Sequence, residues 1–128
     1  EISLGLVGSE MCIRDRYNTT VTDLYTDYLK PQECGNRTGV RYATLVGQKK
    51  VFSLVAEPVM ELNVSHWLPK ELENTWHGKD LPPVTKTVVR CIARQQGVGG
   101  YDSWGAHCNE KYKNKTDKTY RLKFQIRF

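Results

Sequence analysis

The last nine residues of the chain alternate strictly between two kinds of side chain. Charged or amide residues alternate with apolar and aromatic residues, which are Tyr120, Leu122, Phe124, Ile126 and Phe128. Successive side chains of a β-strand point to opposite faces, so this pattern predicts a strand with one buried and one solvated face. Strands of this kind are typical of antiparallel sheets, which can leave one face in water.

Four upstream segments are also predicted to be strands. The runs at residues 40–46 and 50–56 are rich in β-branched and apolar side chains, and Gly47 lies in the short connection between them. That arrangement is typical of a hairpin. Residues 85–93 form a further β-branched run, and residues 19–28 are the fourth candidate.

One short helix is expected between these strands. Ser65 and Pro69 mark its beginning, residues 70–76 favour helix, and Gly78 is in position for its C-terminal cap. Several short strands with one short helix predict an all-β fold, an antiparallel β-sandwich. At 128 residues the chain is long enough for one domain and too short for two independent cores.

The positive charge of the chain is concentrated in its last segment. Residues 111–128 hold seven Lys and Arg and one Asp, whereas the net charge of the whole chain is only +5. A basic nucleic-acid-binding β-domain is therefore an alternative that rests on this segment alone, and we expect no nucleic-acid partner. We also expect no membrane partner, because no apolar run approaches the ~18–20 residues of a spanning helix.

The sequence offers no catalytic or metal-binding constellation. Ser103 and His107 lack the nucleophile elbow of a serine hydrolase, and the spacing of the carboxylates selects no acid–base pair. We therefore predict no catalytic residue and no metal site in this chain. A disulfide is left open, because no C-x-x-C or Cys/His ligand spacing is found among Cys12, Cys34, Cys91 and Cys108.

The glycine-rich segment at residues 96–105 is the candidate binding loop. It reads QGVGGYDSWG, which matches neither of the glycine patterns that bind phosphates. Trp104, flanked by glycine and small polar residues, is suited to presenting its indole face to a sugar ring, and Asp102 is suited to accepting hydroxyl hydrogen bonds. The alternative is that Trp104 is a core residue beside a β-bulge.

The first sixteen residues are treated separately. They read EISLGLVGSEMCIRDR, which lacks the pattern of a signal peptide and resembles translated sequencing-adapter DNA. We expect residues 1–16 to be a non-native leader, with the true chain beginning near Tyr17 and truncated at its N-terminus. The alternative is an ordinary N-terminal strand at residues 2–7.

Two motifs give the chain a family resemblance. Residues 28–41, YLKPQECGNRTGVR, are similar to the Y-x-x-P-Q-E-x-G-N-R-x-x-V-R segment of large β-galactosidases of glycoside hydrolase family two. Residues 97–105, GVGGYDSWG, are similar to the G-V-G-G-D-D-S-W-G segment of their last domain. The resemblance covers residues 17–128, with departures at Tyr101 and Cys34, where the family commonly has Asp and Asn.

The resemblance implies a fold and a function. The chain would be the C-terminal β-sandwich domain of a retaining β-galactosidase, inactive alone because the family's catalytic glutamates lie in a barrel absent here. Trp104 and Asp102 would bind substrate at the mouth of the active site. Gln32, Glu33, Gly35, Asn36 and Arg37 would be mainly structural or support the pocket.

The resemblance also implies partners and leaves other matters open. The partners would be a β-galactoside or related sugar, the catalytic barrel of the parent polypeptide, and further copies in a homo-oligomer of the parent enzyme. No cofactor is expected in this chain, because the Mg²⁺ ligands of the family lie elsewhere. A free-standing carbohydrate-binding module that uses Trp104 is the alternative function. The compartment is open between bacterial cytoplasm and periplasm.

Overall fold

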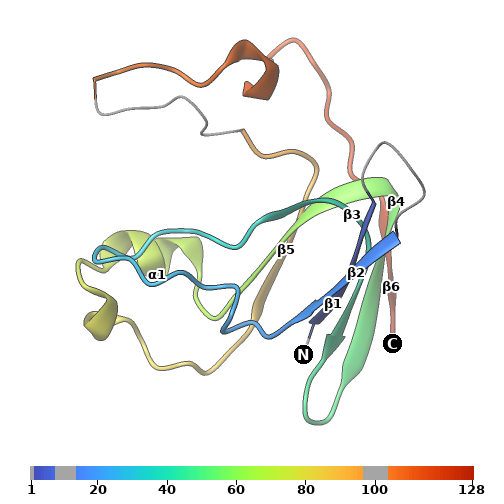
Figure 1. Cartoon of the computed structure of the whole chain (residues 1–128), viewed down its shortest axis with the longest axis horizontal. Coiled ribbons are helices and arrows are strands. Elements are labelled where there is room, and N and C mark those ends of the chain that lie inside the picture. Colours follow the sequence, from blue (N-terminus) through green and yellow to red (C-terminus); the bar gives the residue numbers. More distant parts are fainter. Residues whose placement is uncertain (1, 8–13, 97–103) are drawn as a thin grey trace.

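Six antiparallel strands make up the sheet of the computed structural model, which describes residues 2–7, 14–96 and 104–128, with side chains from Tyr17 onward (Figure 1). The strand order is β2-β1-β3-β4-β5, and β6 also pairs with β4. The strands are β1 (Ile2–Val7), β2 (Arg14–Thr19), β3 (Arg37–Val46), β4 (Val51–Ser65), β5 (Val88–Ile92) and β6 (Phe124–Arg127). Together with one short α-helix in the described residues, this confirms the all-β prediction.

The long strand β4 joins the two halves of the sheet. Its first part pairs with β6 over residues 53–56 and its last part with β5 over residues 61–65, while β3 runs along its other edge. Figure 1 shows β4 bending between these two parts. One strand therefore connects the C-terminal strand to the segment that carries the candidate binding loop.

The hydrophobic core lies mainly on one face of β3 and β4. In the register of this pair, Ala43 opposes Leu54 and Leu45 opposes Phe52. The predicted hairpin is confirmed, because the Gly47 N–H donates to the Lys50 carbonyl at 2.9 Å and closes the turn. The buried cluster consists of Leu24, Val40, Ala43, Leu45, Leu54, Ala56, Met60, Leu62 and Val64.

The strand predicted over residues 19–28 is wrong. β2 ends at Thr19, and a turn follows in which the Thr20 hydroxyl donates to Asp23 at 2.6 Å and accepts the Asp23 N–H at 3.1 Å. The Tyr25 N–H then donates to the Thr22 carbonyl. Such local bonds from Thr and Asp side chains compete with the ladder of a strand.

The last strand is shorter than the alternating pattern predicts. β6 spans only Phe124–Arg127, because its partner β4 changes from β6 to β5 beyond residue 56. One more backbone hydrogen bond joins the two segments next to the paired residues, from the Glu57 N–H to the Lys123 carbonyl at 2.8 Å. Residue 120 belongs to an irregular segment, where the Tyr120 hydroxyl accepts the Lys115 N–H.

The predicted helix is present but ends early. The helix α1 (Pro69–Asn74) begins at the expected proline, and Thr75 caps its C-terminus by donating its hydroxyl to the Glu71 carbonyl at 2.7 Å. Gly78 is therefore not the cap, and it opens the 3-10 turn η1 (Gly78–Asp80) instead. A second 3-10 turn, η2, spans Glu110–Tyr112. None of the described helices has the length and apolar character needed to cross a membrane.

The first two strands lie at one edge of the sheet. β1 pairs with both β2 and β3, so the backbone of residues 2–7 is hydrogen-bonded within the sheet. The pairing describes this sequence whether or not residues 1–16 are native, so it does not test where the segment comes from. The assignment of residues 1–16 as a leader stays a prediction.

Candidate functional site

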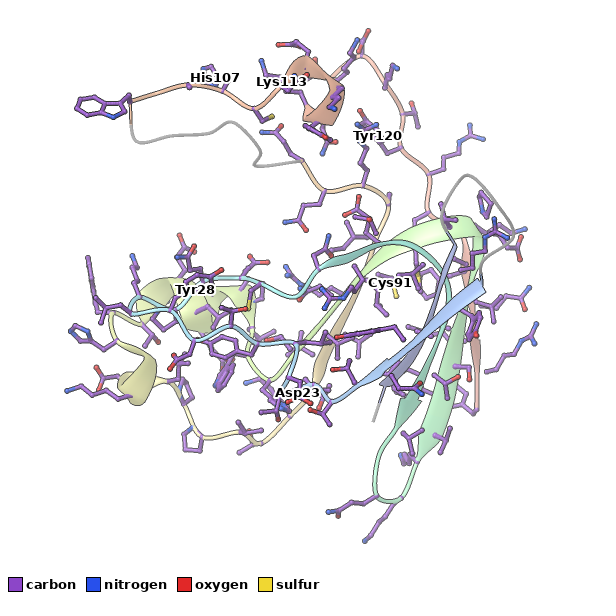
Figure 2. The ribbon with its side chains drawn as sticks, viewed as in Figure 1. Asp23, Tyr28, Cys91, His107, Lys113 and Tyr120 are labelled. Carbon is purple, nitrogen blue, oxygen red and sulfur yellow. The ribbon has the colours of Figure 1, made fainter. Side chains whose placement is uncertain are left out.

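Trp104 lies on an extended arm between β5 and β6. Its side chain is 93% exposed, so it is not part of the hydrophobic core. Figure 2 shows His107 and Lys113 on this arm, well away from Cys91 in the sheet. Asp102 and Ser103, the other candidates from this loop, lie outside the described residues, as does Cys12.

Arg94 holds the two sides of the arm together at its base. Its guanidinium donates to the Lys111 carbonyl at 2.9 Å and lies 5.9 Å from the centre of the Tyr120 ring. The Arg94 carbonyl accepts a bond from the Asn114 amide at 3.4 Å. These contacts close the segment that carries Trp104 into a loop with a fixed base.

The loop at residues 32–37 is fixed to β4 and β5 by a side-chain network. Glu33 forms an ion pair with Arg90 of β5. Arg90 also donates to the Asn63 side-chain oxygen at 3.0 Å, and the Asn63 amide donates to the Cys34 carbonyl at 2.7 Å. Asn63 is only 3% exposed, so its bonds are made in the interior of the fold. This network supports the structural interpretation of the motif.

Gly35 is required where the loop passes the segment before it. Its φ is +74°, and a Cβ at this position would lie 2.5 Å from the Leu24 carbonyl oxygen. The neighbouring Cys34 accepts the Thr26 N–H at its sulfur at 3.2 Å. Both contacts hold the loop against residues 24–26. Cys34, which stands where the family commonly has Asn, therefore accepts a local hydrogen bond.

The first motif and the segment that leads into the glycine-rich loop meet at one pocket of about 610 Å³. Glu33, Cys34, Gly35 and Asn36 line one side. The other side includes residues 94–96, which lead directly into the glycine-rich loop, and Tyr112 of the arm. Segments about 60 residues apart in the sequence therefore form one site.

The carboxylates of this pocket make contacts that hold the fold together. Glu33 is paired with Arg90, and Glu61 accepts a bond from the Asn36 amide at 2.8 Å. We therefore assign both to holding the loop rather than to acid–base chemistry. The Asn36 side-chain oxygen is buried and has no hydrogen-bond partner among the residues that the structure describes.

The basic segment is partly neutralised by neighbouring acids. Lys123 forms an ion pair with Glu57, and Lys113 forms one with Glu110. The hydrogen bond from Lys123 lowers the pKa of Glu57, and the bond to Glu57 raises the pKa of Lys123. Part of the positive charge of this segment is thus neutralised, locally by Glu110 and through a contact with β4 by Glu57.

Three cysteines of the described residues, Cys34, Cys91 and Cys108, are free thiols. Burial raises the pKa of the Cys91 thiol, which keeps it protonated and poorly nucleophilic. In the part of the chain that the structure describes, no three His, Cys, Asp or Glu side chains gather as a metal-ligand set.

Comparison with known proteins decides the family. The model of the family described as "Beta galactosidase small chain" matches residues 11–126. The chain belongs to the beta-galactosidase small-chain family. The match includes the pocket-lining loop, β3 to β6 and the whole arm of this small-chain sequence.

Relatives of this small-chain sequence bear matching names. A beta-galactosidase of Halalkalibacterium halodurans is 38% identical over 122 residues, and one of Priestia megaterium is 38% identical over 109. These alignments cover 93% and 84% of this chain, but only 12% and 10% of the relatives. A "Beta-galactosidase small subunit" of Latilactobacillus sakei is 29% identical over 115 residues, covering 80% of this chain and 36% of that subunit. The chain thus spans a minor part of each relative.

Sequence reasoning missed two residues that organise the site. Arg90 and Asn63 carry the network that holds the loop, yet neither stands in a motif or at a spacing that signals a contact. Only the register of β4 and β5, in which these two residues oppose each other, brings them together.

Proposed function

We propose that this chain is the C-terminal part of a retaining β-galactosidase of glycoside hydrolase family two. The observation that carries the proposal is the small-chain family match over residues 11–126, which includes an arm that exposes 93% of the Trp104 side chain. The named beta-galactosidase relatives are many times longer than this segment. Their additional length is sufficient for a separate catalytic domain.

In this function Trp104 and Asp102 bind the sugar rather than cleave it. The indole face of Trp104 stacks on the C–H bonds of the galactose ring, and the Asp102 carboxylate accepts bonds from its hydroxyls. Retaining hydrolysis needs two carboxylates about 5–5.5 Å apart, one as acid–base and one as nucleophile. That pair, and the Mg²⁺ ligands, are supplied by the catalytic domain.

The partner of the chain is therefore the catalytic barrel of its parent enzyme. The name of the Latilactobacillus sakei relative, a small subunit, supports association with a larger chain. The contacts of Arg94 with Lys111 and Tyr120 hold the two sides of the arm together at its base, which favours a defined position of Trp104 at the partner's active site. The parent enzyme is proposed to be a homo-oligomer.

The proposal is tested by reconstitution. The purified chain and the parent polypeptide lacking this segment are assayed with a chromogenic β-galactoside, separately and mixed. We expect no turnover by the chain alone and a large gain of activity on mixing. Turnover by the chain alone that one carboxylate substitution abolishes would contradict the proposal. Galactoside binding by the chain, with no association and no gain, would favour the free-standing carbohydrate-binding module instead.

A further inference from the structure

A second pocket lies on the α1 side of the molecule, apart from the arm. Its volume is about 750 Å³, within the usual range of small-ligand sites. Figure 2 shows Tyr28, one of its lining residues, beside α1, whereas His107 lies on the separate arm. Three aromatic rings, Tyr25, Tyr28 and Trp67, line the pocket together with the loop at residues 77–84.

The aromatic wall of this pocket is held in a fixed geometry. The Trp67 indole N–H donates to the Pro82 carbonyl at 2.8 Å. The Tyr25 and Trp67 rings pack with centroids 5.0 Å apart. The adjacent His66 is bonded to the Thr22 hydroxyl at 3.1 Å. The loop and the ring pair are therefore positioned before any ligand arrives, which lowers the entropy cost of binding.

Two polar groups of the pocket residues, the Asp27 carboxylate and the Tyr25 hydroxyl, are not used by the described fold. The Asp27 carboxylate accepts no hydrogen bond and forms no ion pair within the described residues. The Tyr25 hydroxyl is buried without a hydrogen-bond partner in the described part of the chain. Burial raises the pKa of Tyr25, and the charge of the nearby Asp27 raises it further, so the hydroxyl stays a neutral donor. Gly78 leaves room for Asp27, because a Cβ there would lie 3.0 Å from its carboxylate oxygen.

We propose that this pocket binds a neutral oligosaccharide at a site separate from the Trp104 loop. Exposed aromatic faces such as Tyr28, which is 41% exposed, accept the C–H face of a pyranose ring. The free Asp27 carboxylate accepts hydrogen bonds from its hydroxyls. Lys79 lines the same pocket as Asp27, so the lining carries both signs of charge and no charge on the sugar is favoured. The inference goes beyond the proposed function, because it involves neither Trp104 nor catalysis.

The test is an NMR titration of the 128-residue chain with lactose, followed at the backbone amides. We expect millimolar binding, with shifts at residues 25–29 and 77–84. Sorbitol, which has the hydroxyls of a hexose but no ring, should cause no comparable shifts. Tyr28→Ala should weaken binding about fivefold and Asp27→Asn at least about twofold. Tyr42→Ala removes a tyrosine of matched exposure, 37%, on β3 and should change nothing.

The same titration separates this inference from the proposed function. Trp104→Ala should leave the shifts at residues 25–29 and 77–84 unchanged, whatever happens at the arm. The inference is overturned if lactose leaves these amides unmoved, or if sorbitol moves them equally. It is also overturned if neither Tyr28→Ala nor Asp27→Asn weakens the response. Protection of these amides by the parent polypeptide, with no response to lactose, would identify a protein interface and overturn it as well.

Discussion

At the scale of single residues, the buried amide of Asn63 links the loop at residues 32–37 to β5. It donates to the Cys34 carbonyl and accepts from Arg90, which in turn is paired with Glu33. A buried amide with both ends bonded is stable, whereas one left unpaired costs about 1–3 kcal/mol. The loop at residues 32–37 is therefore held in part by a residue of the sheet interior, outside its own sequence.

Gly35 provides the residue-scale prediction. Gly35→Ala should lower the free energy of unfolding by about 2–4 kcal/mol, because left-handed strain adds to a clash with the Leu24 carbonyl. Gly105→Ala is the matched control: its φ is +90°, but no atom lies within 4 Å of the added Cβ, so it should cost about 1 kcal/mol. Urea unfolding measures both. Equal losses for the two variants would show that the close approach at Gly35 is unimportant.

Residue-scale function was only partly predictable from the sequence. Glycine and small polar neighbours marked Trp104 as a candidate, but they did not distinguish a core residue from an exposed one. The distinction depends on the arm leaving the sheet, and the contacts of Arg94 with Lys111 and Tyr120 that close this arm have no sequence signature. Asp102 lies outside the described residues and stays a prediction.

At the scale of elements, local sequence patterns predicted the structure where no side-chain hydrogen bond or other strand pairing competed with them. The β3–β4 hairpin was predictable from two β-branched runs and a short turn, and α1 from its proline. The strand expected at residues 19–28 failed because Thr20 and Asp23 bond to each other. β6 is short because β4 pairs with β5 instead of β6 further along its length. This tertiary effect cannot be read from the alternating pattern of the last nine residues.

The helix α1 gives a pH prediction. The Glu71 carboxylate accepts hydrogen bonds from Lys86 at 2.6 Å and from the Leu68 N–H at 2.7 Å, and both bonds lower its pKa. Its folded pKa lies below the ordinary 4.5, so its contribution to stability is fully present above pH 4.5. The contribution is lost as the pH falls through the folded pKa.

Carboxyl NMR titration of Lys86→Met checks this assignment. The pKa of Glu71 should rise toward 4.5 without reaching it, because the bond from Leu68 remains. Lys49→Met, which removes an exposed lysine from the hairpin turn, should leave that pKa unchanged. A Glu71 pKa that is the same in Lys86→Met and in the parent chain would rule out the assigned cause.

The leader makes a second prediction at the element scale. If residues 1–16 are foreign to the domain, their deletion should change the free energy of unfolding by less than about 1 kcal/mol. The described core begins at Leu24, and the pairing of β3, β4, β5 and β6 does not need β1. Denaturant unfolding of the shortened chain measures the change. A larger loss would show that the paired strands β1 and β2 belong to the domain.

At the scale of the whole molecule, two short motifs were enough to predict a relation to β-galactosidases. The family match confirms that relation as membership of the small-chain family. The structure adds that residues 33–36 of the first motif share one pocket with residues 94–96, which precede the second motif. The order of the two motifs in the sequence indicated the family, whereas the contact of the first motif with Arg90 depends on how β4 and β5 pair.

The most direct measurement is the effect of Trp104→Ala on the steady-state kinetics and thermal stability of the complete enzyme. An exposed stacking platform predicts a KM raised about three- to tenfold and an unchanged Tm, with Trp104→Phe in between. Trp76→Ala removes another exposed indole, 72% exposed against the 93% of Trp104, and should leave KM unchanged. An unchanged KM with a loss of about 3–5 kcal/mol in stability would contradict the account, because that is the effect of emptying a core position.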